Sequence, residues 1–416
     1  MKRQKIPRSS SAAVAQAYDV IVVGGGLAGL AQGCLLARAG FSVLLCEAAA
    51  LPTLGDKNYD LRTTALSFAS RNILQDIGVW DELAPHACPI QDIRIADGNA
   101  PGYLHFNAGE VDAEAFGWIV ENHRLRSALT QKLQSYKNAE LRAPVKVTAL
   151  AYGAVDVAAT LSDGKTQRAK LLIAADGRNS FVREWAGIQT IDHDYQTHAV
   201  VCNLWHEKDH HHHAIEHFMP NGPFAVLPMM KGKKHFHSSL VWSETPERAA
   251  ALVEMDEKDF NALLFHHMPH YGKIGVAGPR RAYPLSFKHA VKYYAPRIAL
   301  ISETVHAMHP IAGQGLNVGM RDVACLSQIL MDARTLGLDI GSEVLLQRYG
   351  AMRMPDSLAM SAATYGLDAL FSNHLATAAW ARRRGLGIVG KIMPLKKFFM
   401  RYAMGLTHRP THRIAA

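Results

Sequence analysis

A glycine-rich turn that begins at residue 24 constrains what this chain can fold into more than any other feature of the sequence. Gly24, Gly26 and Gly29 follow an apolar, β-rich run at 19–23 and precede a segment of helical character. Glycine lets the chain turn tightly, brings the backbone against a pyrophosphate and allows the helix to pack close to the strand. The N–H groups at the start of such a helix bind phosphates. The turn therefore predicts a dinucleotide site.

The residues after the turn complete this unit. We expect a helix at 30–39, ended by Gly40, and a second apolar strand at 41–46. Glu47 comes next, 18 residues after the last glycine, where an acid accepts hydrogen bonds from an adenosine ribose. The alternative is that Glu47 is a solvated surface acid. Strand, turn, helix and strand within about thirty residues are typical of half a Rossmann-like sheet.

Strands of a different character fill the middle of the chain. Short β-like runs separated by turns lie at 90–161 and 198–282, whereas 171–175 and 297–301 have the character of buried parallel strands. This interleaving predicts an α/β chain with one domain inserted into another. The expected segments are a disordered basic N-terminus at 1–18; a discontinuous, Rossmann-like dinucleotide-binding domain at 19–95, 120–190 and 296–345; an inserted mixed or antiparallel β-sheet substrate domain at 96–119 and 191–295; and a helical C-terminal region at 346–416.

The net charge of +9 gathers at the two ends of the chain. Residues 369–416 hold nine Lys or Arg and no acid, and residues 1–18 hold four more basic residues and no acid. The rest has 32 basic against 36 acidic residues, so we expect no nucleic-acid groove. Cations alternate with large apolar residues at 380–401, which is typical of a segment on an anionic bilayer surface. A helix packed on the body with solvated charges is the alternative.

Cysteine and histidine indicate no metal or disulfide chemistry. The five cysteines show no CxxC pair and no framework spacing, which predicts free, mostly buried thiols. The run His210–His213, with His206 and His217, could in principle ligate a metal. Four consecutive side chains cannot all point one way, so we expect a solvated loop and no metal site.

Two further motifs each follow a buried strand with an acid. The first strand leads into Asp176 and Gly177. The second leads into Ser302 and Glu303, then into a Pro- and Gly-rich loop before a helix at 316–335. Such a loop lays backbone amides along a flat, electron-accepting ring and places the acid near a polyol chain.

The three motifs, in this order and spacing, resemble the flavoprotein aromatic hydroxylases of the para-hydroxybenzoate hydroxylase type. Within that group the chain closely resembles the ubiquinone-biosynthesis hydroxylases, over about residues 18–405. The matching strings are 60–67, 78–80, 117–126, 222–228, 309–317 and 349–356. The resemblance implies an FAD-binding domain and hydroxylation of the ring of a polyprenyl phenol with NAD(P)H and dioxygen. It nominates no catalytic side chain.

The resemblance also implies a place for each matching residue. The ADP half of FAD would lie on Gly24, Gly26, Leu27, Ala28, Gly29 and Glu47. Arg62 would lie near the pyrophosphate, with Asn122 and Arg126 beside the cofactor, and Asp176 and Gly177 where FAD and the nicotinamide donor both approach. The isoalloxazine would face a loop and its acid, formed by Glu303, Pro310, Gly313, Gln314, Gly315, Leu316 and Asn317.

One string departs from the family pattern. The family usually has Gly-Asp where this chain has Ser302-Glu303. Glu303 is one methylene longer than Asp, and Ser302 adds a Cβ where glycine allows close approach. We expect weaker or shifted flavin binding as the result.

Partners and location follow from the same resemblance. A membrane-resident polyprenyl phenol, an anionic membrane surface and a ubiquinone-biosynthesis complex are the expected partners. We expect a cytoplasmic protein, peripheral on the inner membrane, in preference to the mitochondrial matrix face. Two alternatives stay open: a hydroxylase of a soluble aromatic acid, and a non-catalytic subunit of a ubiquinone-synthesis complex with a degenerate flavin site.

Overall fold

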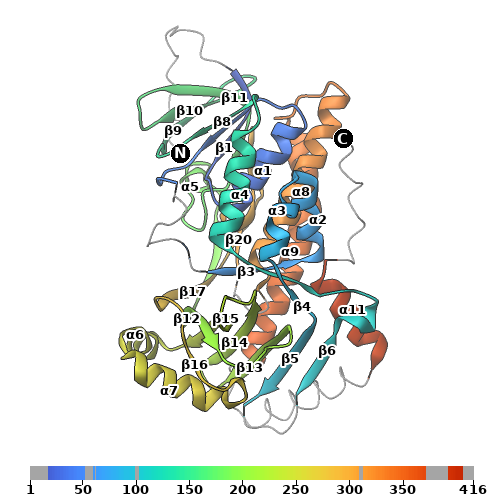
Figure 1. Ribbon diagram of the computed structural model, residues 1–416. Helices are drawn as coiled ribbons and strands as arrows, with labels where there is room; N and C mark the ends of the chain where they lie inside the picture. The colour runs from blue at the N-terminus through green and yellow to red at the C-terminus, as the bar shows by residue number, and fades with distance from the viewer. Residues whose placement is uncertain are drawn as a thin grey trace.

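The protein consists of two large β-sheets, one above the other, joined by a small third sheet and flanked by long helices (Figure 1). This computed structural model describes residues 17–51, 60, 62–98, 103–308, 313–371 and 392–405. The predicted basic N-terminus at 1–18 therefore lies outside the described residues, except for Ala17 and Tyr18, which begin the first strand.

The first sheet has the Rossmann-like order predicted from the glycine turn. Its central strands are parallel, and β2, β19 and the C-terminal half of β11 are completely buried, as expected of a parallel sheet that is covered on both faces. The order is β18 (Tyr294–Ala295), β19 (Ile298–Leu300), β11 (Thr166–Ala174), β1 (Ala17–Val23), β2 (Val43–Cys46), β8 (Ala139–Arg142), with β9 (Val147–Tyr152) and β10 (Val157–Leu161) paired antiparallel beyond β11.

Helices pack on this sheet around one large core. α1 is buried over nearly its whole length between the sheet, α4 and α8. It begins directly after Gly26, three residues earlier than predicted, so that its first N–H groups open towards the glycine turn. The helices of this part are α1 (Leu27–Arg38), α2 (Phe68–Ile77), α3 (Trp80–Leu83), η1 (Ala84–His86), α4 (Asn122–Gln134), α5 (Phe181–Trp185), η4 (Ser302–Thr304) and α8 (Gly315–Thr335).

The second sheet is mixed and mainly antiparallel, as predicted for an inserted domain. One face packs on two helices, α6 (Pro246–Glu254) and α7 (Glu257–His267). The strand order is β20 (His306–Ala307), β17 (Arg281–Ala290), β12 (Thr190–His206), β15 (Phe236–Glu244), β14 (Gly222–Met229), β13 (His213–Met219), β5 (Asp92–Asp97), β6 (Leu104–Asn107), with β16 (Ile274–Val276) beside β12. Two short turns, η2 (Ala108–Val111) and η3 (Pro269–Tyr271), complete this part.

A three-stranded antiparallel sheet lies between the two large ones. Its order is β3 (Thr63–Ser67), β7 (Gly117–Glu121), β4 (Cys88–Ile90). β5 follows β4 almost directly, so the chain enters the second sheet at residue 92. The sequence predicted that the first segment of the substrate domain starts at 96. The domain boundaries drawn from the sequence stay a prediction.

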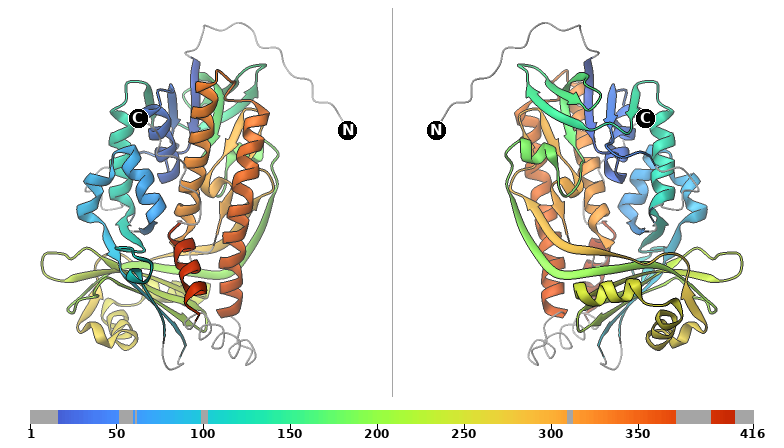
Figure 2. Two further views of the ribbon diagram at one scale, coloured as in Figure 1. Left: turned by 90° about the vertical axis from the view of Figure 1, so that its right-hand side faces the viewer. Right: turned by 90° about the vertical axis from the view of Figure 1, so that its left-hand side faces the viewer.

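The C-terminal region is helical, and its last helix packs on the body. α9 (Glu343–Phe371) runs alongside α8, and α11 (Met393–Ala403) lies across the junction of the sheets (Figure 2). Met400 of α11 and Met404, directly after the helix, join a core with residues of β4, β7 and η2. Part of the basic stretch, residues 380–391, lies outside the described residues. No helix in the described ranges is both long and apolar enough to span a bilayer.

The cysteines are buried as predicted, whereas two of the histidines are not solvated. All five cysteines are free and buried, which confirms the prediction. The prediction that the histidines lie in a solvated loop is wrong for His206 and His210, whose exposed fractions are 0% and 4%. His210 Nε2 lies 2.9 Å from the carbonyl oxygen of Met229, and His206 Nε2 lies 2.9 Å from Ser238 Oγ, so local hydrogen bonds satisfy both rings. Among the described residues, no three His, Cys, Asp or Glu side chains are grouped to hold a metal ion.

Candidate active site

The glycine turn has two kinds of position. At Gly24 and Gly29 the backbone packs too closely for a side chain, whereas at Gly26 the turn leaves open space that a ligand could fill. A Cβ on Gly24 would be 2.3 Å from the carbonyl oxygen of Ala175, and one on Gly29 would be 2.0 Å from that of Gly24. Apart from its chain neighbours, no described residue has an atom within 4 Å of the position that a Cβ on Gly26 would take. Gly26, Leu27, Ala28 and Gly29 all line one large cavity. The turn therefore fits the diphosphate for which it was predicted.

Glu47 and Arg126 contact the same turn from neighbouring elements. Glu47, at the end of β2, accepts hydrogen bonds from Gly25 N (2.5 Å) and Ala49 N (2.7 Å). Arg126 of α4 donates to the carbonyl oxygen of Gly25 at 3.4 Å and lines the cavity. Both side chains are positioned at the turn, and their cofactor roles stay predictions.

Arg62 belongs to a polar cluster on the next stretch of cavity wall. It forms two hydrogen bonds of 2.8 Å with Asp60, which also accepts from Asn122 at 3.4 Å. The hydrogen bond to Asp60 raises the pKa of Arg62, and the charge of Glu303 raises it further. Glu303 therefore lies close enough to interact with Arg62 across the cavity, although 241 residues separate the two in the chain.

The second and third motifs are joined by one threonine. Gly177 N donates to Thr304 Oγ1 at 3.1 Å, and the Thr304 hydroxyl donates to Asp176 at 3.4 Å. Asp176 also accepts from Val182 N at 3.1 Å, and burial raises its pKa. The carboxylate of Asp176 thus ties the loop after β11 to α5 and to Thr304, while Gly177 lines the cavity. No pattern in the sequence indicated that Thr304 joins the two motifs.

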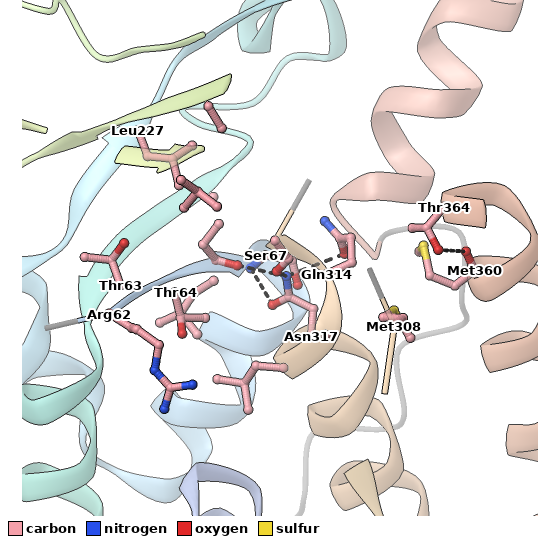
Figure 3. Close-up of a pocket in the computed structure, with 18 of the residues that line it drawn as sticks. Arg62, Thr63, Thr64, Ser67, Leu227, Met308, Gln314, Asn317, Met360 and Thr364 are labelled. Carbon is pink, nitrogen blue, oxygen red and sulfur yellow. Dashed lines mark hydrogen bonds between the residues drawn. The ribbon is translucent and has the colours of Figure 1, made fainter. Parts of the chain in front are cut away.

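Asn317 anchors the loop predicted to face the flavin. Its Oδ1 accepts from Ser67 N (2.9 Å) and Ser70 Oγ (2.8 Å), and its Nδ2 donates to the carbonyl oxygen of Ala65 (2.8 Å). Figure 3 shows Asn317 and Gln314 beside Ser67 at the cavity wall. Gly313 has φ +61°, which favours glycine, and Gly313, Gln314, Gly315, Leu316 and Asn317 all line the cavity. Pro310 lies outside the described residues.

Ser302, the residue that departs from the family pattern, has left-handed backbone. Its φ is +57°, a region that costs an L-residue about 1–2 kcal/mol. Its N–H donates to Asp322 Oδ2 at 2.9 Å, and its hydroxyl lies so close to α8 that a Cβ on Gly319 would be 2.4 Å away. The departure therefore strains the backbone beside Glu303.

Replacing Ser302 with glycine should stabilise the protein by about 1 kcal/mol, because glycine adopts positive φ without strain. Chemical denaturation of the variant and the parent measures the change. The same substitution at Ser135, which has φ −74°, should lower stability instead. A loss of stability in S302G would show that the serine side chain contributes more than its backbone costs.

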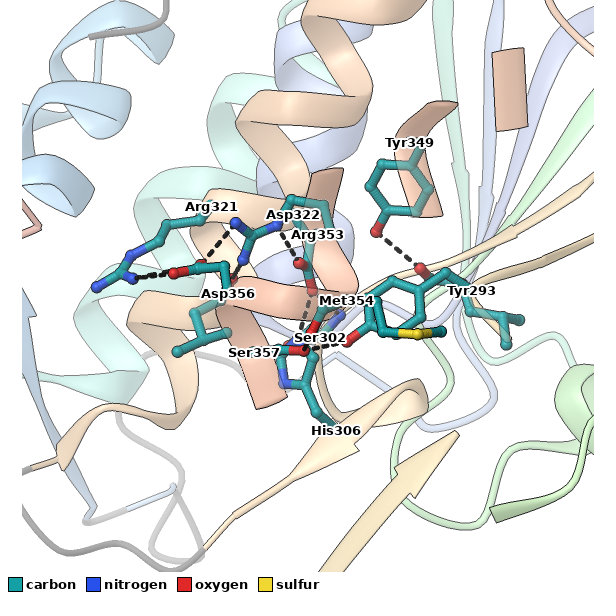
Figure 4. Close-up of polar contacts among 12 residues, drawn as sticks. Tyr293, Ser302, His306, Arg321, Asp322, Tyr349, Arg353, Met354, Asp356 and Ser357 are labelled. Carbon is teal, nitrogen blue, oxygen red and sulfur yellow. Dashed lines mark hydrogen bonds and ion pairs between the residues drawn. The ribbon is translucent and has the colours of Figure 1, made fainter. Parts of the chain in front are cut away.

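A buried ion network supports the cavity floor from behind (Figure 4). Asp322 of α8, 0% exposed, bonds His306 Nε2 at 2.6 Å and Arg353 Nε of α9 at 2.7 Å. Arg353 also pairs with Asp356 at 2.6 Å, and Arg321 pairs with Asp356 at 3.2 Å. Burial alone would raise the pKa of Asp322, but the charges of His306 and Arg353 outweigh it and hold the pKa below its usual range. Arg353 and Asp356 belong to the matching string at 349–356, for which the resemblance implied no role.

The cavity itself has a volume of about 1410 Å³ and reaches from the glycine turn to the second sheet. Its wall on that sheet is mostly apolar, from β5, β6, β12, β13, β14, β15 and β17. Residues of α9 and α11 close the opposite side. Phe398 of α11 lines the cavity and is 55% exposed, so one end of the cavity reaches the surface at α11.

The chain is similar to known proteins over nearly its whole length. A family model described as "FAD binding domain" matches residues 17–363. The ubiquinone hydroxylase UbiL of Rhodospirillum rubrum is 44% identical, over 93% of this chain and 89% of that protein. The 3-demethoxyubiquinol 3-hydroxylase of Escherichia coli is 34% identical, over 94% of this chain and 99% of that protein. The solved p-nitrophenol 4-monooxygenase PnpA of Pseudomonas putida shares the fold, with a TM-score of 0.77 at 19% identity, over 95% of this chain and 100% of that one.

A dinucleotide turn that opens into one cavity with an inserted β-sheet defines a flavoprotein monooxygenase that binds FAD. The relatives narrow this class further. The chain belongs to the family of ubiquinone-biosynthesis FAD-dependent hydroxylases and is a flavin-dependent aromatic hydroxylase.

Proposed function

We propose that this enzyme hydroxylates the aromatic ring of a polyprenyl phenol intermediate in ubiquinone biosynthesis, with NAD(P)H and dioxygen as co-substrates. Bound FAD, reduced by NAD(P)H, would activate dioxygen and supply one oxygen atom to the ring. The protein's residues would hold the ring beside the flavin and exclude water. The observation that carries the proposal is the apolar wall of the second sheet, continuous with the FAD turn in one cavity.

The character of this wall favours a phenol over a soluble aromatic acid. The described residues that line the cavity from the second sheet include one charged side chain, the acid Glu216. A carboxylate substrate would be repelled there, whereas a neutral phenol with an isoprenoid chain suits an apolar wall. The chain end would leave the cavity beside Phe398.

Deletion of the gene tests the proposal, because it should cause a demethoxy- or deoxy-quinone intermediate to accumulate. Mass spectrometry of extracted quinones identifies the intermediate and the ring carbon that lacks oxygen. Unchanged quinone profiles would rule out the proposed reaction. Purified protein that is colourless and takes up no added FAD would favour the non-catalytic subunit, with membership of a ubiquinone-synthesis complex as its remaining role.

We also propose that α11 rests on an anionic membrane surface, with the enzyme peripheral on the inner membrane. Ile392, Met393 and Phe398 are each between 46% and 55% exposed, and Arg401 is exposed beside them. Lys396, by contrast, is 7% exposed and bonds Glu110 at 2.7 Å, so it holds the helix on the body. Apolar side chains beside a cavity mouth, followed by a basic chain end, suit a lipid-borne substrate.

Replacing Phe398 with aspartate should weaken binding to anionic vesicles by roughly 10-fold or more, since an exposed apolar side chain becomes a like charge. Co-flotation with vesicles rich in phosphatidylglycerol measures binding, with neutral phosphatidylcholine vesicles for comparison. The control is Phe265→Asp on α7, where an equally exposed phenylalanine lies on the far side of the second sheet. Equal loss in both variants would contradict a docking face at α11.

A further inference from the structure

Glu216 is an acid set into the apolar wall of the cavity. Side chains alternate between the two faces of a strand, and on β13 the residues Ala214, Glu216 and Phe218 line the cavity. Ile215 and Met219 point the other way, into the core beneath α6 and α7. The strand therefore directs the Glu216 carboxylate towards the space where a substrate would lie.

The neighbours of Glu216 offer it no partner. Its cross-strand neighbours are Ala225 on β14 and Ile95 on β5, and both line the cavity. No hydrogen bond or ion pair to its carboxylate exists within the described residues. The next cavity-facing residues on the two flanking strands are also uncharged: Ile93 on β5, and Pro223 and Leu227 on β14. The other charged cavity residues all lie on other elements: Asp60, Arg62, Arg126, Arg178 and Glu303.

A lone acid in such a wall costs folding stability. Desolvation by burial raises the pKa of Glu216 to about 7. Buried polar groups in folded proteins are normally paired, and an unpaired acid inside a cleft marks a candidate functional residue. A ligand that donates a hydrogen bond would supply the missing partner.

We propose that Glu216 accepts a hydrogen bond from the ring hydroxyl of the substrate and so fixes which edge of the ring faces the flavin. This inference rests on the proposed function, because a phenol hydroxyl is the donor that a polyprenyl phenol brings into an apolar wall. No covalent bond forms or breaks: the proton stays shared between the phenol oxygen and the carboxylate. Sharing it raises the electron density of the ring at the positions ortho and para to the hydroxyl.

The test compares a short-chain prenyl phenol with its O-methyl ether, which cannot donate, on the FAD-loaded enzyme. The wild type should bind the phenol roughly 10-fold or more tightly than the ether, since a hydrogen bond to a charged group is lost. Glu216→Leu should abolish this discrimination and lower kcat/KM for the phenol by roughly 10- to 100-fold. Glu216→Asp should restore part of it. Glu254→Gln, an exposed acid on α6, is the matched control and should behave as wild type.

A second measurement needs no substrate. Because the folded pKa is raised, the wild type loses stability as pH rises from the unfolded pKa of about 4.5 to about 7, and the loss persists above that. Glu216→Gln should therefore raise the Tm at about pH 8.5 but not at about pH 5.

The outcomes separate this inference from the proposed function. Hydroxylation by the wild type with unchanged discrimination in Glu216→Leu would overturn the role of Glu216 alone. Discrimination between phenol and ether without hydroxylation would overturn the proposed reaction and leave the binding role. Equal binding of phenol and ether by the wild type would overturn the inference outright.

Discussion

Replacing Asp322 with alanine should destabilise the enzyme by about 3–5 kcal/mol, the largest loss we expect from a single side chain. The carboxylate is fully buried and accepts from His306, Arg353 and the backbone of Ser302. Removing it would leave the ring of His306 and the guanidinium of Arg353 without their shared partner in a medium where water cannot replace it. Urea denaturation of the FAD-loaded protein measures the effect.

Two further variants keep this result interpretable. Asp322→Asn retains the shape and one acceptor, so it should fold and lose less stability than Asp322→Ala. Asp339→Ala removes an ion pair with Arg297 in which the Asp339 side chain is 46% exposed. This variant should lose less than about 1 kcal/mol of unfolding free energy. Similar losses at positions 322 and 339 would contradict a structural role for the buried network.

Replacing Gly29 with alanine should reduce bound FAD by roughly 10-fold or more. The new Cβ would lie 2.0 Å from the carbonyl oxygen of Gly24, a backbone atom that moves only if the whole turn moves. Displacing the turn by even one ångström would take its N–H groups out of hydrogen-bond range of the pyrophosphate. The ratio of flavin to protein absorbance in the purified enzyme measures retention.

Gly366→Ala on α9 is the matched control, because its new Cβ would meet no atom within 4 Å in the described residues beyond its chain neighbours and the local helix backbone. This variant should keep its flavin. Full retention of FAD by Gly29→Ala would show that the turn is more adaptable than its contacts indicate, and would weaken the assignment of the diphosphate to this loop.

The features that could be predicted most reliably from the sequence are those where the backbone geometry requires a particular residue type. Gly24 and Gly29 could be identified because glycine alone fits such close backbone contacts, and the strands around them carry continuous apolar runs. The inserted sheet could be predicted from alternation and turns. These signals are local, so they survive without knowledge of what the segment packs against.

Features that depend on distant partners could not be predicted. His210 sits in a polar run, and its burial depends on the carbonyl group of Met229. Glu216 occupies a strand position that suits either a solvent-facing or a cavity-facing acid, and its neighbours on β5 and β14 decide between them. Lys396 belongs to a basic stretch expected at a membrane, and Glu110, 286 residues earlier, binds it to the body.

The bonds made by Asn317 have a consequence for how the chain matures during synthesis. Asn317 Oδ1 caps the start of α2 through Ser67, across 250 residues of chain. The strands on either side of β1 also arrive at very different times, β2 within the next thirty residues and β11 only after about 120 more. The glycine turn is therefore synthesised long before β11 and Asn317, the strand and the capping residue that stabilise this region. Flavin loading is therefore tied to synthesis of at least the first 317 of the 416 residues, so the ribosome has made about three quarters of the chain before a holoenzyme can exist.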